Sequence, residues 1–264
     1  MSRTFFARLA TLIATLALAA PVLAEEPDRR PPPAEPAPPA FAIDVPILVY
    51  HHVVPGHSPG PLFATPEGFE DQLKYLKDNG YQAISFHDLA DSVEYGAALP
   101  DHPVILTFDD GWENQYAYAF PLLQKYGFTA TFFVVTSYLD HQNFMTLDQL
   151  RTMLAAGMTI GDHTRSHPPL PSIGSGQRLG DEIAGSKAWL EQQLGIVVDA
   201  FAYPYGSYTP AVAAAVKAAG YRAARTVDGG THITADNLET LPGMVFSAFI
   251  SRNRVELAAG ETRR

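Results

Sequence analysis

Apolar and polar positions along the chain repeat in one pattern, in which a helix-like stretch ends at a glycine and a short apolar run follows at once. Residues 65–80 show the pattern first, because a threonine cap and a proline open a helix that has Phe69, Leu73 and Leu76 on one face. A capping box at 146–149 opens another of these helices. Helices of the later units end at Gly127, Gly157, Gly195 and Gly220. Glycine at this place accommodates the left-handed residue that ends a helix.

The apolar runs predict a set of short strands. They cover residues 45–50, 81–84, 104–108, 129–135, 158–160, 196–198 and 221–223. Strands that alternate with helices indicate a parallel sheet with helices packed outside it. We therefore expect a single domain of the α/β class, a distorted (β/α)7-type barrel slightly short of eight repeats. An open doubly wound sheet is the alternative, although its dinucleotide-binding version lacks the G-x-G-x-x-G motif after a strand.

The two ends of the chain differ in composition from this domain. Residues 1–24 combine a basic start with a 12-residue apolar run, which is short for a membrane helix and typical of a signal peptide. Residues 25–41 hold seven of the 22 prolines and predict an extended spacer. We expect the folded domain at 42–250 and a polar tail at 251–264. An uncleaved N-terminal anchor is the alternative to signal cleavage.

Composition excludes several classes of protein. Apolar residues make up 47% of the chain and charged residues 17%, which is enough material for a sizeable core. The absence of cysteine excludes a disulfide scaffold, a thiol nucleophile and a cysteine-ligated metal. A net charge of −10 argues against a nucleic-acid partner, whose protein surface is basic. We expect an exported monomer, periplasmic or secreted, with no membrane span once the signal is removed.

Polar residues gather directly after the apolar runs, at four places along the chain. These segments are 51–52, 109–111, 163–167 and 204–206. Because the carboxyl ends of parallel barrel strands lie on one face, where active sites are built, the four segments are expected to converge on one cleft.

The charged residues of these segments allow an ordinary and a functional interpretation. Asp109 and Asp110 suit a solvated turn, but the apolar strand before them places the pair at the mouth of the sheet. The spacing of His163 and His167, four residues apart, either arises by chance or allows both imidazoles to bind one metal. One aspartate and two histidines would hold a divalent metal with a position left for water, while the other aspartate takes a proton. His51 is the best-placed acid for a leaving group.

The remaining histidines are expected to be surface or supporting residues, namely His52, His57, His87, His102, His141 and His232.

Taken in this order, the four segments resemble the polysaccharide deacetylase family with the NodB homology domain (carbohydrate esterase family 4), over roughly residues 43–245. Residues 107–111 are similar to its T-F-D-D-G motif, with a base followed by a metal ligand. Residues 163–167 are similar to its H-[ST]-x-x-H motif, with two metal ligands. Residues 201–206 are similar to its R-x-P-Y segment, whose tyrosine N–H binds the oxyanion. The resemblance implies Asp109 as base, Tyr205 at the oxyanion, and the metal ligands Asp110, His163 and His167.

Two departures from the family pattern stand out. The motif arginine falls at Ala202, so the usual partner of the base aspartate is absent, and residues 241–249 lack the late L-x-H motif that supplies the acid. Both departures occur in a subgroup similar to the poly-N-acetylglucosamine deacetylases of biofilm systems, in which an early Y-H supplies the acid. The Tyr50-His51 pair is similar to that Y-H and independently indicates His51 as the acid.

The resemblance implies a metal-dependent hydrolase that removes N-acetyl groups from N-acetylglucosamine units of a cell-envelope or extracellular polysaccharide and releases acetate. Zinc is the expected metal, Co²⁺ or Ni²⁺ the alternatives, and no organic cofactor is expected. An O-acetyl esterase acting on xylan or another glycan is one alternative function, and a non-catalytic glycan-binding protein is another. Aromatic residues that would stack on sugars or pack in the core are Trp112, Tyr203, Tyr205, Tyr208 and Phe246.

Overall fold

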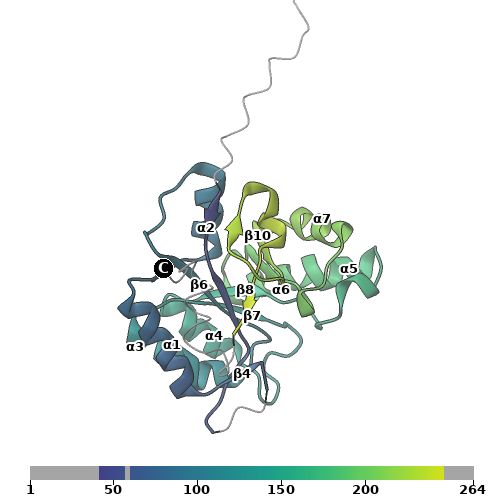
Figure 1. Cartoon of the computed structure of the whole chain (residues 1–264). Coiled ribbons are helices and arrows are strands. Elements are labelled where there is room, and N and C mark those ends of the chain that lie inside the picture. Colours follow the sequence, from purple (N-terminus) through teal and green to yellow (C-terminus); the bar gives the residue numbers. More distant parts are fainter. Residues whose placement is uncertain (1–41, 57–59, 247–264) are drawn as a thin grey trace, which may run out of the picture. The chain divides into compact units, whose positions relative to one another are not determined.

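A computed structural model describes residues 42–56 and 60–246 of the chain, all of which fall in one compact unit, Ala37–Arg264 (Figure 1). The predicted signal segment 1–24, the spacer 25–41 and the tail 251–264 lie outside the described residues, as do positions 247–250 of the predicted domain.

An eight-stranded sheet forms the centre of the described part. Seven strands follow one another in the order β10-β9-β8-β7-β6-β2-β12, β5 pairs with the start of β6, and every pairing is parallel. Their bounds are β2 Ile47–Tyr50, β5 Gln82–Ala83, β6 Pro103–Phe108, β7 Thr131–Val134, β8 Thr159–Asp162, β9 Ala200–Ala202, β10 Ala223–Arg225 and β12 Met244–Val245.

The sheet curls until its two ends meet. Leu241, just before β12, makes a parallel bridge to Arg225 of β10, while β12 itself pairs with β2. Two short pairs stand apart, with β1 (Ile43–Asp44) antiparallel to β11 (His232–Ile233) and β3 (His52–Val53) parallel to β4 (Phe63–Ala64). The prediction of an α/β domain with a distorted barrel is confirmed.

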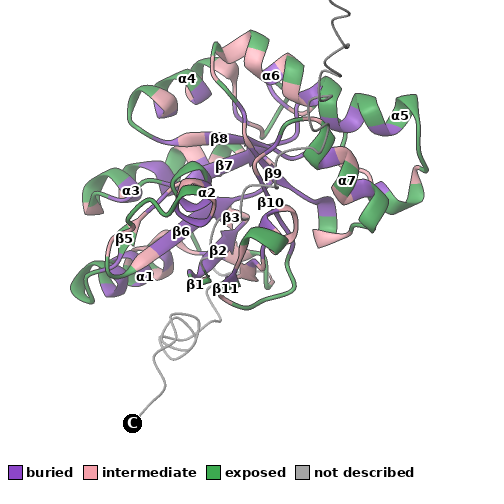
Figure 2. Ribbon diagram, turned by 90° about the horizontal axis from the view of Figure 1, so that it is seen from above, coloured by how far each residue is buried: buried purple, intermediate pink, exposed green. Residues whose placement is uncertain are grey.

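Helices surround this sheet, and Figure 2 shows buried strands with exposed residues on the outer helix faces. The α-helices are α1 Pro66–Asp78, α2 Phe86–Tyr95, α3 Phe120–Tyr126, α4 Leu147–Ala155, α5 Gln177–Gly180, α6 Ser186–Leu194 and α7 Pro210–Ala218. Two π-helical segments, Gln115–Ala119 and Asp181–Gly185, precede α3 and α6. Short 3-10 turns lie at Leu170–Ser172, Pro204–Gly206 and Ala235–Thr240. Within the described residues, no helix has the length and apolar character that a membrane crossing requires.

Local sequence signals explain where several helices begin and end. The Thr65 hydroxyl accepts from the Gly68 N–H, and the capping box at the start of α4 forms as predicted. Helix α2 was not predicted from the sequence, although Ser85 and Asp88 form a capping box at its start.

The predicted strand 196–198 is wrong. Its backbone is bonded by side chains of α6 and not by a neighbouring strand, since the Val198 N–H donates to Glu191 at 3.0 Å and its carbonyl accepts from Lys187. Val197 is 79% exposed, and the sheet resumes only at β9. A β-branched run of this kind can bond to a neighbouring strand or to other groups. Here its backbone bonds to side chains of α6.

Alternate residues of the strands belong to two apolar clusters. Leu48, Leu106 and Phe132 pack with residues of α1, α3, α4, α6 and α7. Ile47, Ile105 and Phe133 pack with residues of α2. Both faces of the sheet are therefore covered, which explains the continuous apolar runs in the sequence.

Gly161 of β8 provides a test of this packing. A Cβ at this position would lie 2.4 Å from the Phe133 ring and 3.3 Å from the Ala200 carbonyl oxygen. We expect Gly161→Ala to lower the free energy of unfolding by about 1–3 kcal/mol, because the buried ring has to move. Urea unfolding followed by circular dichroism measures the change.

The matched control is Gly180→Ala in α5, where nothing lies within 4 Å of the added Cβ and the backbone is helical. This variant should be neutral or slightly more stable. Equal stability of the two variants would contradict the packing described for β8.

Candidate metal centre and active site

The four polar segments meet at the carboxyl ends of the strands, as the sequence predicts. His51 follows β2, Asp109 and Asp110 follow β6, His163 follows β8, and Tyr205 lies in the turn after β9. Side-chain contacts between these segments join them into one site.

Asp110, His163 and His167 form the metal-binding candidate. The two Nε2 atoms of the histidines are 3.2 Å apart, and they lie 3.6 Å (His163) and 3.4 Å (His167) from Oδ1 of Asp110. Ligand atoms at roughly 2.0–2.1 Å from a tetrahedral ion lie about 3.3–3.4 Å from one another. The three side chains therefore fit one divalent metal.

Neighbouring groups orient these ligands. Nδ1–H of His163 donates to the Ala202 carbonyl at 2.7 Å, which turns Nε2 toward Asp110. Trp112 Nε1–H donates to Oδ2 of Asp110 at 3.0 Å and leaves Oδ1 for the histidines. Burial lowers the pKa of His163 to about 4 and also lowers the pKa of His167. Both imidazoles are thus neutral at pH 7, which is the form that binds metal.

The loop that carries the two histidines is held in an uncommon backbone conformation. Thr164 and His167 have φ values of 71° and 58°, in the left-handed region. Asp162 accepts the Thr164 N–H at 2.7 Å, and Thr164 Oγ1 accepts the His167 N–H at 2.9 Å. Asp162 is fully buried and also accepts from the hydroxyls of Ser186 and Tyr221. Burial raises the pKa of Asp162 to about 7.

Asp109 is buried beside the metal candidate and pairs with Arg225. Nη2 of Arg225 donates to both of its oxygens, at 2.5 and 2.6 Å, and the arginine side chain is completely buried. Burial alone would raise the pKa of Asp109, but the charge of Arg225, followed by those of His163 and His51, outweighs it and lowers the pKa.

His51 also lies near Asp109, with 3.7 Å between its Nε2 and Oδ2 of the aspartate. Its Nδ1 is buried and has no hydrogen-bond partner in the described part of the chain. The position of the ring depends on Gln115, a fully buried residue whose Nε2 donates to the carbonyls of both His51 (2.7 Å) and Asp109 (2.5 Å). One amide group thus fixes the ends of β2 and β6 relative to each other.

Comparison with known proteins agrees with this geometry. The sequence profile of the polysaccharide deacetylase family matches residues 96–224. YxkH of Bacillus subtilis (strain 168), a polysaccharide deacetylase by name, is 30% identical over 211 residues, which cover 78% of this chain and 74% of that protein. The chain belongs to the polysaccharide deacetylase family.

Two further relatives add detail. The structure of the Streptococcus pyogenes deacetylase PplD in complex with acetate aligns with a TM-score of 0.78 and 29% identity, over 83% of this chain and 99% of that one. The poly-β-1,6-N-acetyl-D-glucosamine N-deacetylase of Escherichia coli (strain K12) is 37% identical over 70 residues, which are 26% of this chain and only 10% of that protein.

Arg225 takes the place of the arginine that the family motif would have at Ala202. The missing motif arginine at Ala202 implied that Asp109 lacks its usual partner, and the structure corrects this expectation. Strand pairing sets Arg225 of β10 directly beside Ala202 of β9, so the guanidinium reaches Asp109 from the adjacent strand. An arginine at the end of an apolar strand, in Ala223-Ala224-Arg225, was the only signal in the sequence.

The aromatic candidates separate by exposure. Tyr203 and Phe246 are buried and belong to the core, whereas Tyr208 is partly exposed and packs on Tyr203. Trp112 is half-buried beside Asp110. Tyr205 is 66% exposed, its ring lies 4.7 Å from the His167 ring, and its backbone has φ 60°.

The other histidines lie outside the metal cluster. The His52 ring stacks on Phe63 at 4.2 Å and contacts Trp112 at 4.5 Å. Exposed histidines are His87, His102, His141 and His232, while His57 lies outside the described residues.

The buried ion pair gives a stability prediction. Arg225→Met should lower the free energy of unfolding by about 3–5 kcal/mol at pH 7, because Asp109 then remains buried without a counter-charge. The double variant Arg225→Met/Asp109→Asn should regain part of this loss. Urea unfolding in the presence of a chelator separates the effect from metal binding.

Arg151→Met is the matched control, since Arg151 pairs with Asp148 on the surface. It should cost less than about 1 kcal/mol. If Arg225→Met is as stable as this control, the Asp109–Arg225 pair has no structural importance.

Proposed function

We propose that the protein is a zinc-dependent deacetylase that removes N-acetyl groups from N-acetylglucosamine units of an extracellular or cell-envelope polysaccharide. The observation that carries the proposal is the position of Asp109, which lies 3.7 Å from His51 and directly precedes Asp110 of the Asp-His-His cluster. A candidate base and a candidate acid therefore lie beside one metal site, as amide hydrolysis requires. The acetate in the PplD structure and the name of the Escherichia coli relative support the substrate class.

In the proposed mechanism, Asp110, His163 and His167 hold the metal. When bound, the metal supplies a Lewis acid for the acetyl carbonyl and for the attacking water. Asp109 accepts the proton of that water. The lowered pKa of Asp109 keeps its carboxylate ionised at neutral pH, and Arg225 fixes its orientation.

Two groups complete the reaction. His51 donates a proton to the departing amine, because an amine leaves poorly as an anion. The Tyr205 N–H donates a hydrogen bond to the oxygen of the acetyl group as charge develops there. A preorganised donor of this kind contributes roughly 3 kcal/mol to the stability of a transition state.

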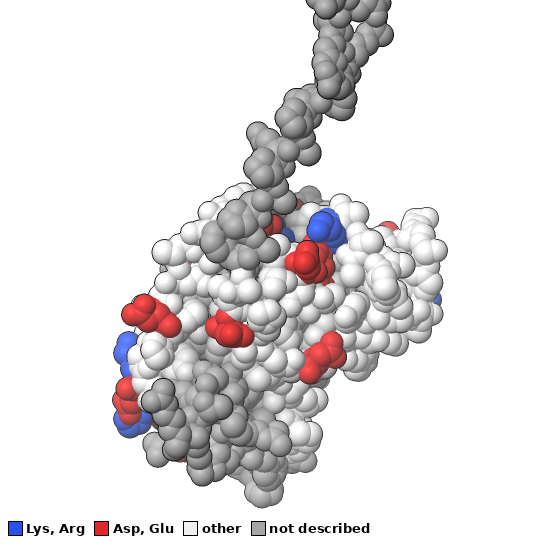
Figure 3. Space-filling view, turned by 45° about the horizontal axis from the view of Figure 1, so that its top comes forward, with Lys and Arg blue, Asp and Glu red and all other residues white. Residues whose placement is uncertain are grey.

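We further propose that the enzyme acts outside the cytoplasm as a monomer. Residues 1–24 have the pattern of an export signal, and a polysaccharide substrate of this class lies beyond the cytoplasmic membrane. Charge is consistent with a glycan partner and not a nucleic acid. On the face drawn in Figure 3, charged side chains of the described residues form small separate groups without a continuous basic surface.

Hydrolysis of O-acetyl esters on a glycan is the second candidate function. One observation favours it, namely that the buried Nδ1 of His51 has no partner among the described residues. No carboxylate therefore orients this imidazole from behind, as would be expected for a strong acid catalyst. Ester hydrolysis depends less on an acid catalyst, because an alkoxide is easier to expel than an amine.

Metal removal and Asp109→Asn test the proposed function. Acetate release from N-acetylglucosamine oligomers should fall at least about 100-fold in either case, because each removes an essential group. Adding Zn²⁺ should restore the chelated wild-type protein only. Asp101→Asn, at an exposed aspartate before β6, is the matched control and should retain full activity. Activity that survives complete metal removal would contradict the proposal.

His51→Ala distinguishes the two candidate functions. For an N-deacetylase, kcat on acetylated glucosamine should fall about 100-fold or more, while kcat on an O-acetylated xylan oligomer falls much less. The measurement is acetate release from both substrates by the same preparation. An enzyme whose natural reaction is ester hydrolysis would show full ester turnover in this variant and negligible amide turnover in the wild type.

A further inference from the structure

A polar hollow of about 510 Å³ lies beside the metal-binding loop. Its walls come from the loop after β7, the metal-binding loop and the start of α6, and include Thr136, Ser137, Arg165, Asp181 and Trp189. Arg165 lies midway between His163 and His167 in the sequence. The hollow is thus adjacent to the proposed metal centre, and the mechanism above does not use it.

Backbone hydrogen bonds fix the hollow relative to the metal loop. The Thr136 N–H donates to the Thr164 carbonyl at 3.2 Å, and the Ser137 N–H donates to the Arg165 carbonyl at 2.9 Å. The Arg165 N–H in turn donates to the Glu182 carbonyl at 3.2 Å. Two residues span at most about 7 Å of chain, so the backbone at Arg165 lies close to both metal-binding histidines.

Two side chains of the hollow have binding capacity that the fold does not use. Arg165 is exposed, and its guanidinium forms no ion pair or hydrogen bond within residues 42–56 and 60–246. By contrast, Arg151, Arg222 and Arg225 each pair with a carboxylate. Trp189 packs partly against the core and is half-buried, and its indole has no ring partner in the described part of the chain.

These groups suit a sugar ring. The C–H face of a pyranose packs on the negative face of an aromatic ring, and a guanidinium donates two parallel hydrogen bonds to oxygen substituents. Asp181 and Ser137 add an acceptor and a hydroxyl at the edge of the hollow. A volume of about 510 Å³ lies within the roughly 300–1,000 Å³ of small-molecule sites.

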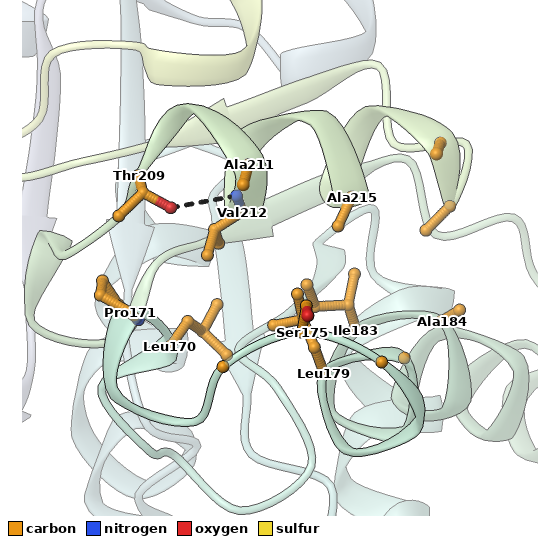
Figure 4. Close-up of a pocket in the computed structure, with 15 residues that line it drawn as sticks. Leu170, Pro171, Ser175, Leu179, Ile183, Ala184, Thr209, Ala211, Val212 and Ala215 are labelled. Atoms are coloured by element: carbon orange, nitrogen blue, oxygen red, sulfur yellow. Dashed lines mark hydrogen bonds between the residues drawn. The ribbon is translucent and has the colours of Figure 1, made fainter.

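The other large cavity lacks these properties. It measures about 600 Å³ and lies between the 170–184 region and α7 (Figure 4). Apolar residues of its lining include Leu170, Leu179, Ile183, Val212 and Ala215. A sugar would lose hydrogen bonds to water in this cavity without replacing them.

We propose that the polar hollow is a second sugar subsite, which binds a unit of the glycan near the unit whose acetyl group is removed. Trp189 lies against the ring, and Arg165 binds its oxygen substituents. This inference rests on the proposed function for the identity of the chain that enters it. The consequence is a preference for longer oligomers over short ones.

Kinetics with oligomers of two lengths test the subsite. For Trp189→Ala and Arg165→Ala, KM for a β-1,6- or β-1,4-linked N-acetylglucosamine tetramer should rise about tenfold. The tetramer-to-dimer ratio of kcat/KM should fall by a similar factor. Arg178→Ala removes an exposed arginine of α5 that does not line the hollow, and it should leave both values as in the wild type. An unchanged ratio in both hollow variants would overturn the proposal.

A binding experiment decides the subsite even if the proposed function fails. The chain has two tryptophans, so Trp112→Phe leaves Trp189 as the single indole. We expect its emission to change on titration with either tetramer, with weaker binding when Arg165→Ala is added. Emission that does not respond to any tetramer contradicts the subsite. A protein that binds the tetramer but releases no acetate loses its proposed function and keeps the subsite.

Discussion

The buried ion pair between Asp109 and Arg225 is the interaction on which the site depends. It joins the ends of β6 and β10, which three other strands separate in the order of the sheet. The pair therefore crosses the curled sheet and forms only when the barrel is completely assembled. Two buried charges are costly to desolvate, so the geometry must supply both of the short hydrogen bonds that are observed. Folding and the orientation of the proposed base are in this way coupled.

The same pair explains how two adjacent aspartates remain charged. Asp109 is directed to Arg225, whereas Asp110 has a φ of 74° and is directed to the two histidines. Asp109 thus pairs with a positive guanidinium and Asp110 with the two metal-binding histidines. These partners compensate the repulsion between the two carboxylates. Gln115 holds the backbone of the base and that of His51 with a single amide. The proposed acid, the proposed base and the metal candidate are therefore placed by three different contacts that the loops alone would not provide.

The sequence predicted the parts of this arrangement that depend on local signals. Segments after apolar strands, the capping boxes and the spacing of His163 and His167 are local, and the structure brings the four segments together as expected. Arg225 was missed because its role depends on the register of β9 against β10, which no local pattern reveals. Gln115 was missed for a similar reason, since its two acceptors lie on different strands. The false strand at 196–198 arose because propensity cannot show that Glu191 and Lys187 bond that backbone.

Metal content of two neighbouring variants tests the central claim most directly. In the proposed mechanism Asp110 binds the metal and Asp109 accepts the proton, although only one peptide bond separates them. Asp109→Asn and Asp110→Asn should therefore be compared by mass-spectrometric metal analysis after dialysis against Zn²⁺. We predict about one Zn²⁺ per chain in Asp109→Asn and almost none in Asp110→Asn. Equal metal content in both variants, or loss of metal from Asp109→Asn alone, would contradict the assignment of the two aspartates.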